Sequence, residues 1–143
     1  MKPILVGSLA VAIAAVAAGF GYFLATGSGS VEEGRALYAD NCAGCHGVNL
    51  EGQPDWKVRL PSGRLSAPPH DETGHTWHHS DRQLFALVKF GPAALSPGYE
   101  SDMPAYDGVL TDDEIRAVLG YIRSTWPEPA QAYQADRSRA DPS

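Results

Sequence analysis

The chain has 143 residues, of which 43% are hydrophobic and 20% are charged, so it has room for one small globular domain with short appendages and is too short for a multidomain enzyme. Its formal charge is −6, and because Lys2 is the only basic residue before Val31, the part from Val31 onward has ten basic and seventeen acidic residues and a charge of −7. Such a surface repels phosphate backbones, so we expect no nucleic-acid partner. Two cysteines are too few for a disulfide framework.

An uncharged segment of twenty-two residues, 4–25, is about as long as a helix that crosses the hydrocarbon core of a membrane once. Lys2 precedes this segment, which predicts that the chain after it lies outside the cytoplasm. A cleaved signal peptide is the alternative, but the apolar run continues through several aromatic residues, which favours an uncleaved anchor. We therefore expect a transmembrane anchor or signal sequence over residues 1–25 and a flexible tether over residues 26–30. The remainder would lie on the periplasmic side of a bacterial inner membrane, or be exported and soluble after cleavage.

Two helices are predicted in the first part of the exported chain. Ser30 and Glu33 have the form of a capping box, and the pattern that follows indicates a helix from Val31 to about Asn41, interrupted by Gly34. A long irregular segment, residues 47–80, separates this helix from the next. Ser80 and Asp81 then begin a second helix, which Gly91 ends.

A third helix is the best-marked element. It follows an irregular segment, residues 92–110, and Thr111 and Glu114 form its capping box. Pro127 ends it. Its buried stripe consists of Ile115, Val118, Leu119 and Ile122. Residues 128–143 are polar and aperiodic, and we expect them to be disordered.

The sequence therefore predicts an all-α domain over residues 31–127, with three main helices, long loops and no strands. Three short helices bury too little apolar surface to hold loops of this length, and small domains commonly need a metal, a cofactor or disulfides. We expect a large, flat, apolar cofactor at the centre of this domain.

The segment CAGCH contains Cys42, Cys45 and His46. Thiols at this spacing can reach the two vinyl groups of one haem as thioethers, and the adjacent imidazole can then bind the iron. A redox disulfide is less favoured because no strand precedes the motif, and a structural zinc site would need a second ligand pair that the sequence lacks. We expect one covalent haem c per chain.

Residues 31–126 resemble a class I c-type cytochrome. The resemblance rests on GRALYADNC running into CAGCHG, on SDMPAY, and on the last helix EIRAVLGYIRSTW. It implies that the first and last helices cross, with Gly34 and Tyr38 against Val118 and Tyr121. It also implies that Met103, which precedes Pro104, is the second axial ligand of the iron.

Met103 is the only methionine besides Met1, and it lies in an irregular, proline-containing segment where a core-filling side chain would be unusual. The competitors for the sixth position are four histidines within ten residues, which could alternatively hold copper or zinc. They are His70, His75, His78 and His79. Trp77, in the same segment, is a candidate to pack beside the haem or to bind a propionate.

His46 should be held in one tautomer by a carbonyl that accepts its Nδ1 proton. The resemblance implies that a proline supplies this carbonyl, and Pro68 and Pro69 are the nearest matches. Arg59 and Arg64 are candidates to neutralise propionates, although solvated loop charges are the simpler interpretation.

Iron with two protein ligands has no vacancy for a substrate, so we expect an electron-transfer protein with no catalytic residues. The predicted function is a membrane-tethered carrier of single electrons between respiratory-chain proteins: a quinol-oxidising complex and a terminal oxidase or dehydrogenase. The alternatives are a cytochrome subunit of a larger membrane oxidase or dehydrogenase complex, and a haem or metal sensor that uses His70 to His79.

Overall fold

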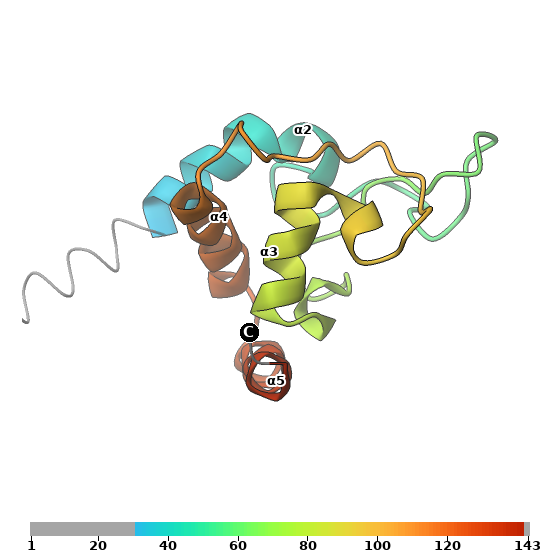
Figure 1. Ribbon diagram of the computed structural model, residues 1–143. Coiled ribbons are helices and arrows are strands. Elements are labelled where there is room, and N and C mark those ends of the chain that lie inside the picture. The colour runs from blue at the N-terminus through green and yellow to red at the C-terminus, as the bar shows by residue number, and fades with distance from the viewer. Residues whose placement is uncertain (1–30, 142–143) are drawn as a thin grey trace, which may run out of the picture.

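The computed structural model describes residues 31–141. Residues 31–41 are helical, and the elements that follow are α2 (Ala43–His46), α3 (Asp81–Phe90), α4 (Asp112–Ser124) and α5 (Glu128–Ala140), with 3-10 turns η1 (Thr76–His78) and η2 (Pro92–Ala94) (Figure 1). Within residues 31–141 there are two isolated bridges and no strand, which confirms the all-α prediction. The predicted anchor, the tether and the cap at Ser30 lie outside these residues. None of the helices between residues 31 and 141 is long and apolar enough to cross a membrane.

Local sequence explains where α3 and α4 begin. At the start of α3, Ser80 accepts a hydrogen bond from the backbone N–H of Gln83, whose side chain accepts one from the Ser80 N–H. Thr111 and Glu114 form the same reciprocal pair at the start of α4, as predicted. These caps satisfy backbone N–H groups that have no partner within the helix.

The first helix crosses α4 at Gly34. A Cβ atom at this position would lie 2.0 Å from the carbonyl oxygen of Ala117 and 3.0 Å from Cβ of Tyr121, so a side chain cannot be accommodated without moving one helix. One turn further along, the Tyr38 ring lies 5.6 Å from the Tyr121 ring. The expected crossing is confirmed, with Ala117 rather than Val118 as the closest neighbour of Gly34.

The hydrophobic core lies beneath this crossing and between α3 and α4. Its buried members come from the first helix, from α2 to α5, and from the segments after α2 and between α4 and α5; they are Tyr38, Ala43, Leu50, Leu84, Val118, Ile122, Trp126 and Ala130. Tyr38 and Val118 are each 1% exposed. The side chain of Cys42 packs against this cluster, so the CAGCH segment is attached directly to the core.

Residues 128–140 are helical, which corrects the prediction of a disordered tail. Ala130 and Gln134 are buried, and Gln134 donates to the Asp81 carboxylate at 2.8 Å. Near the end of α5, Ser138 accepts from the Asp81 N–H at 2.9 Å, and Asp141 accepts from Ser80. The helix is therefore held on the beginning of α3 by polar contacts, which hydrophobic periodicity does not reveal.

Candidate functional site

The two cysteines lie one helical turn apart: Cys42 follows the first helix and caps α2, and Cys45 lies within α2. The backbone N–H groups of Cys45 and His46 both donate to the Cys42 carbonyl, at 3.1 and 2.9 Å. Both thiols are free, with Cys42 half-buried and Cys45 exposed. Burial and the neighbouring Cys45 raise the pKa of the Cys42 thiol to about 11.

His46 is held in one orientation by the loop that precedes η1. Its Nδ1 lies 2.9 Å from the carbonyl oxygen of Pro68, and its side chain is buried. Because a carbonyl can only accept a hydrogen bond, Nδ1 donates its proton there, and the Nε2 lone pair is left for another partner. Burial lowers the pKa of His46, which favours this neutral form. The expected carbonyl is thus that of Pro68 and not that of Pro69.

Gly52 positions the Pro68 carbonyl. Its φ angle is +69°, and a Cβ atom there would lie 2.4 Å from the backbone nitrogen of Pro69. The Gly52 N–H also donates to the His46 carbonyl at 2.7 Å. One glycine therefore contacts both sides of the hydrogen bond that orients the imidazole, a role that the sequence analysis missed.

The segment with Met103 is tied to the same place. The hydroxyl of Tyr106 donates to the carbonyl of Asn41, next to Cys42, at 2.6 Å. Burial raises the pKa of Tyr106, and the nearby Cys42 and Cys45 contribute. In Figure 1 the segment before α4 passes α2. Half-buried Met103 is three residues from this anchor.

The four clustered histidines do not meet at one point, although the rings of His75 and His79 lie 5.6 Å apart. His70 stacks on His46 with ring centroids 4.0 Å apart, His75 stacks on Trp56 at 5.4 Å, and His78 lies against Trp77. Between residues 31 and 141, no group of three or more His, Cys, Asp or Glu side chains is placed to hold a metal ion. The residues between 31 and 141 therefore give no support to the alternative of a copper or zinc site at this cluster.

The other candidates are engaged with protein groups. The Trp77 indole N–H donates to the Glu72 carbonyl at 3.4 Å, and the ring packs against the core. Arg59 donates to the Gly63 carbonyl. Arg64 forms ion pairs with Asp102 and with Glu100. These contacts fix the shape of the loops rather than mark a second site.

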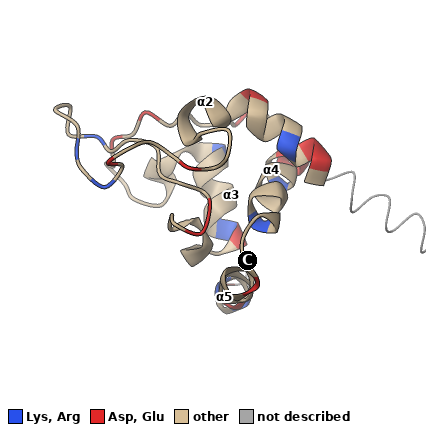
Figure 2. Cartoon of the chain, turned by 180° about the vertical axis from the view of Figure 1, so that it is seen from behind, with Lys and Arg blue, Asp and Glu red and all other residues tan. Residues whose placement is uncertain are grey.

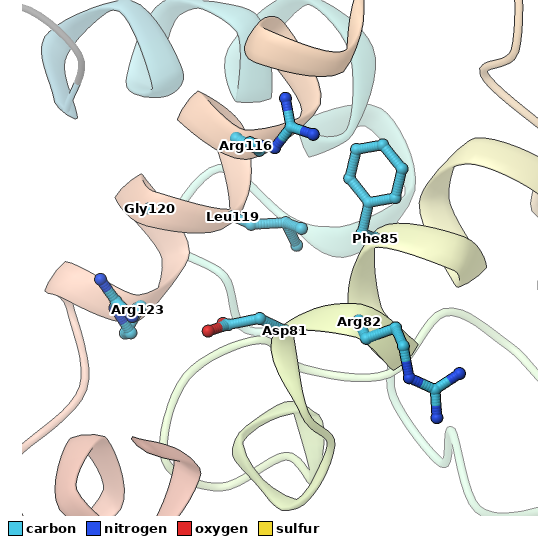
Figure 3. A pocket seen from close by; sticks show the side chains of 7 residues that line it. All are labelled: Asp81, Arg82, Phe85, Arg116, Leu119, Gly120 and Arg123. Carbon is cyan, nitrogen blue, oxygen red and sulfur yellow. The ribbon is translucent and has the colours of Figure 1, made fainter. Parts of the chain in front are cut away.

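A hollow between α3 and α4 is lined by different residues (Figure 3). Phe85 and Leu119 form its apolar wall, and Arg82, Arg116 and Arg123 surround it. Arg116 lies 5.1 Å from the Phe85 ring centre. Cys42, Cys45, His46 and Met103 do not line this hollow.

The donor set fits a covalently attached haem. Two free thiols lie one turn apart, the adjacent imidazole has its Nδ1 occupied and its Nε2 available, and a thioether lies on a segment bound beside them. Thiols, imidazole and thioether are the groups by which proteins hold haem c.

Comparisons with known proteins place the chain in a family. A sequence model of the family described as Cytochrome c matches residues 31–126, and the chain belongs to that family. A nitrite reductase of Stutzerimonas stutzeri is 28% identical over 94 residues, 66% of this chain and 16% of that protein. The cbb3-type cytochrome c oxidase subunit FixP of Bradyrhizobium diazoefficiens is 30% identical over 95 residues, 64% of this chain and 29% of that subunit.

Cytochrome c-555 of Prosthecochloris aestuarii is 28% identical over 79 residues, 51% of this chain and 80% of that protein. The chain spans less than a third of the length of the nitrite reductase and of FixP. No solved structure matches it. Membership of the family implies covalently bound haem c.

Proposed function

We propose that one haem c is held by thioethers from Cys42 and Cys45, with His46 and Met103 as the axial ligands of its iron. The observation that carries this assignment is the 2.9 Å contact between His46 Nδ1 and the Pro68 carbonyl, which leaves Nε2 as the metal-binding nitrogen. Each thioether forms by addition of an S–H group across a vinyl group, so attachment needs no oxidant.

The haem supplies a one-electron Fe(III)/Fe(II) couple when bound. The protein's own part is to keep both axial positions occupied. His46 is buried and fixed through Nδ1, and the Tyr106 contact with Asn41 holds the Met103 segment beside the attachment motif. With neither position open to a substrate, the site is suited to electron transfer rather than to catalysis.

We further propose that residues 4–25 anchor the domain in a bacterial inner membrane, with the haem on the periplasmic side. The support is the length of this uncharged segment, with Lys2 before it. The tether would then raise the effective concentration of the carrier near membrane-bound partners. The proposed partners are a quinol-oxidising complex and a terminal oxidase or dehydrogenase.

Charge supports transient docking on a basic partner. From Val31 onward the formal charge is −7, and Figure 2 shows acidic segments along the first helix and in several loops. A negative surface is attracted to a basic dock over roughly the Debye length, about 8 to 10 Å at moderate ionic strength. Electron transfer to such a partner should therefore slow as salt is added.

A second candidate is a cytochrome subunit of a larger membrane complex. FixP of Bradyrhizobium diazoefficiens and CcoP of Azospirillum brasilense are both named as subunits of cbb3-type cytochrome c oxidases. Mild-detergent extraction of native membranes separates the two candidates. A free carrier elutes alone, whereas a subunit elutes with partner chains at fixed stoichiometry.

The haem assignment is tested on the full chain, produced with a haem-attachment system. A denaturing gel stained for haem and a pyridine haemochrome assay should show one covalent haem per chain. Cys42→Ser and Cys45→Ser should each shift the haemochrome band, because one vinyl group stays unreacted. Gly44→Ala is the matched control within the motif, since its Cβ would meet nothing within 4 Å. A wild-type chain that loses all haem on the gel would contradict the proposal.

The anchor is tested by washing membranes that contain the full chain with alkaline carbonate. We expect the haem-stained band to stay in the pellet and to be accessible to protease from the periplasmic side. Complete release by the wash, with an N-terminus beginning after the apolar segment, would instead show a cleaved signal.

A further inference from the structure

The imidazole of His70 lies flat on the imidazole of His46. The ring centroids are 4.0 Å apart and the planes differ by 21°. Pro68, whose carbonyl holds His46 Nδ1, is two residues before His70 in the same loop. One short segment therefore gives His46 both a hydrogen-bond acceptor at its edge and a flat neighbour on its face.

His70 is itself held from several sides. Its Nδ1 lies 2.8 Å from the hydroxyl of Thr76, and its backbone N–H donates to the Leu50 carbonyl at 2.7 Å. Its own carbonyl accepts from the indole N–H of Trp126 at 2.7 Å. The Tyr38 ring meets it edge-on, 6.4 Å between centroids. The two backbone hydrogen bonds fix the position of the loop, and the contacts with Thr76 and Tyr38 restrict rotation of the ring, so His70 is a rigid support.

The Pro68 hydrogen bond leaves one motion of His46 open. An imidazole fixed at Nδ1 and bound to a metal through Nε2 can still rotate about the line through its two nitrogens. A flat group stacked on one face blocks that rotation, because the ring edge would then collide with it. Residues that contact a metal ligand without binding the metal themselves commonly orient that ligand.

We propose that His70 is a positioning residue that fixes the plane of the His46 imidazole above the haem. This inference rests on the proposed ligation by His46. The plane of an axial imidazole determines which iron d orbital its π electrons overlap. In the ferric protein it therefore determines the anisotropy of the electron spin and its distribution around the macrocycle. This role requires that the flat ring of His70 stack on His46 and that Thr76 hold the His70 ring in place.

The test compares full-length, haem-loaded variants by electron paramagnetic resonance and by proton NMR of the haem methyl groups, both in the ferric state. In His70→Leu the face of His46 loses its flat neighbour. We expect displaced g values and a changed order of the methyl resonances. His70→Phe keeps a flat ring and should remain closer to the wild type. Thr76→Val keeps the stacked ring, releases its anchor and should shift the same signals less.

His75→Leu is the matched control, because His75 belongs to the same cluster but stacks on Trp56. It should leave both spectra unchanged. A His70→Leu protein that retains wild-type spectra while its unfolding midpoint falls would show a packing role only and overturn the proposal. If His70→Leu does not fold, unchanged spectra in Thr76→Val, where the stacked ring has lost its anchor, overturn it. Wild-type protein with covalent haem but without His46 ligation would overturn the proposed ligation and this inference together.

Discussion

Gly34 and the carbonyl oxygen of Ala117 are so close that a Cβ atom at position 34 would lie 2.0 Å from that oxygen. The first helix carries Cys42 at its end, and α4 carries much of the core. The closeness of these two helices therefore determines where the attachment motif lies relative to the rest of the domain.

Gly34→Ala should destabilise the protein by about 1–3 kcal/mol, the usual cost of overpacking, because the added methyl group meets backbone that cannot turn aside. Denaturant unfolding of the haem-loaded protein measures the change. Gly120→Ala, within α4, is the control, since its Cβ would meet nothing within 4 Å. The control should keep or gain stability, by up to about 1 kcal/mol, from better helix propensity. Equal stability of the two variants would contradict the tight crossing.

Gly52→Ala should loosen the hold on His46, because the new Cβ would overlap the Pro69 backbone and displace the Pro68 carbonyl. We expect the Nδ1 proton of His46 to exchange faster with solvent, as followed by NMR. Gly63→Ala is the control. Gly63 also has a positive φ angle, +85°, but a Cβ atom there would meet nothing within 4 Å. The control should share any strain cost and leave the exchange of that proton unchanged. The same exchange rate in both variants would refute the role of Gly52.

The contact between α5 and α3 should weaken in acid. The Ser80 hydroxyl and the Arg82 guanidinium lower the pKa of Asp141 below its usual 3.8, with a smaller contribution from Arg137. A carboxylate with a lowered pKa stabilises the folded form above pH 3.8, and this contribution is lost as the pH falls through the lowered value. Relative to an unstructured substrate at the same pH, pepsin should therefore cleave α5 faster as the pH falls below 3.8.

Asp141→Asn should make this cleavage fast already at pH 3.8 and remove most of its pH dependence. Asp136→Asn is the control, because Asp136 pairs with Arg139 within α5 and makes no contact with α3. It should behave as the wild type does. Identical cleavage profiles for the wild type and Asp141→Asn would show that Asp141 does not hold the helix.

The sequence was sufficient where a local signal carries the information. Ser80 as an N-cap predicted the start of α3, and the capping box of Thr111 and Glu114 predicted the start of α4. The resemblance to class I c-type cytochromes implied the close crossing at Gly34. Helix α5 was missed because its polar contacts with α3 depend on the tertiary arrangement: Gln134 donates to the Asp81 carboxylate, and Ser138 accepts from the Asp81 N–H.

The arrangement of the histidine cluster could not be predicted for a similar reason. Its spacing left a shared metal open as an alternative, but His70, His75 and His78 each lie against a different ring. The position of His70, two residues after the proline expected to hold His46, was the one sequence clue to its place. Hydrophobic periodicity in a sequence does not indicate which aromatic rings stack on one another.

The central claim, an electron carrier with His46 and Met103 on its iron, is tested most directly by the visible spectrum of the ferric full-length protein. The weak long-wavelength band of sulfur-to-iron charge transfer should be present in the wild type and absent from Met103→Ala, while the covalent haem content stays the same. A Met103→Ala protein with the wild-type spectrum, or a wild type without the band, would show that Met103 does not bind the iron.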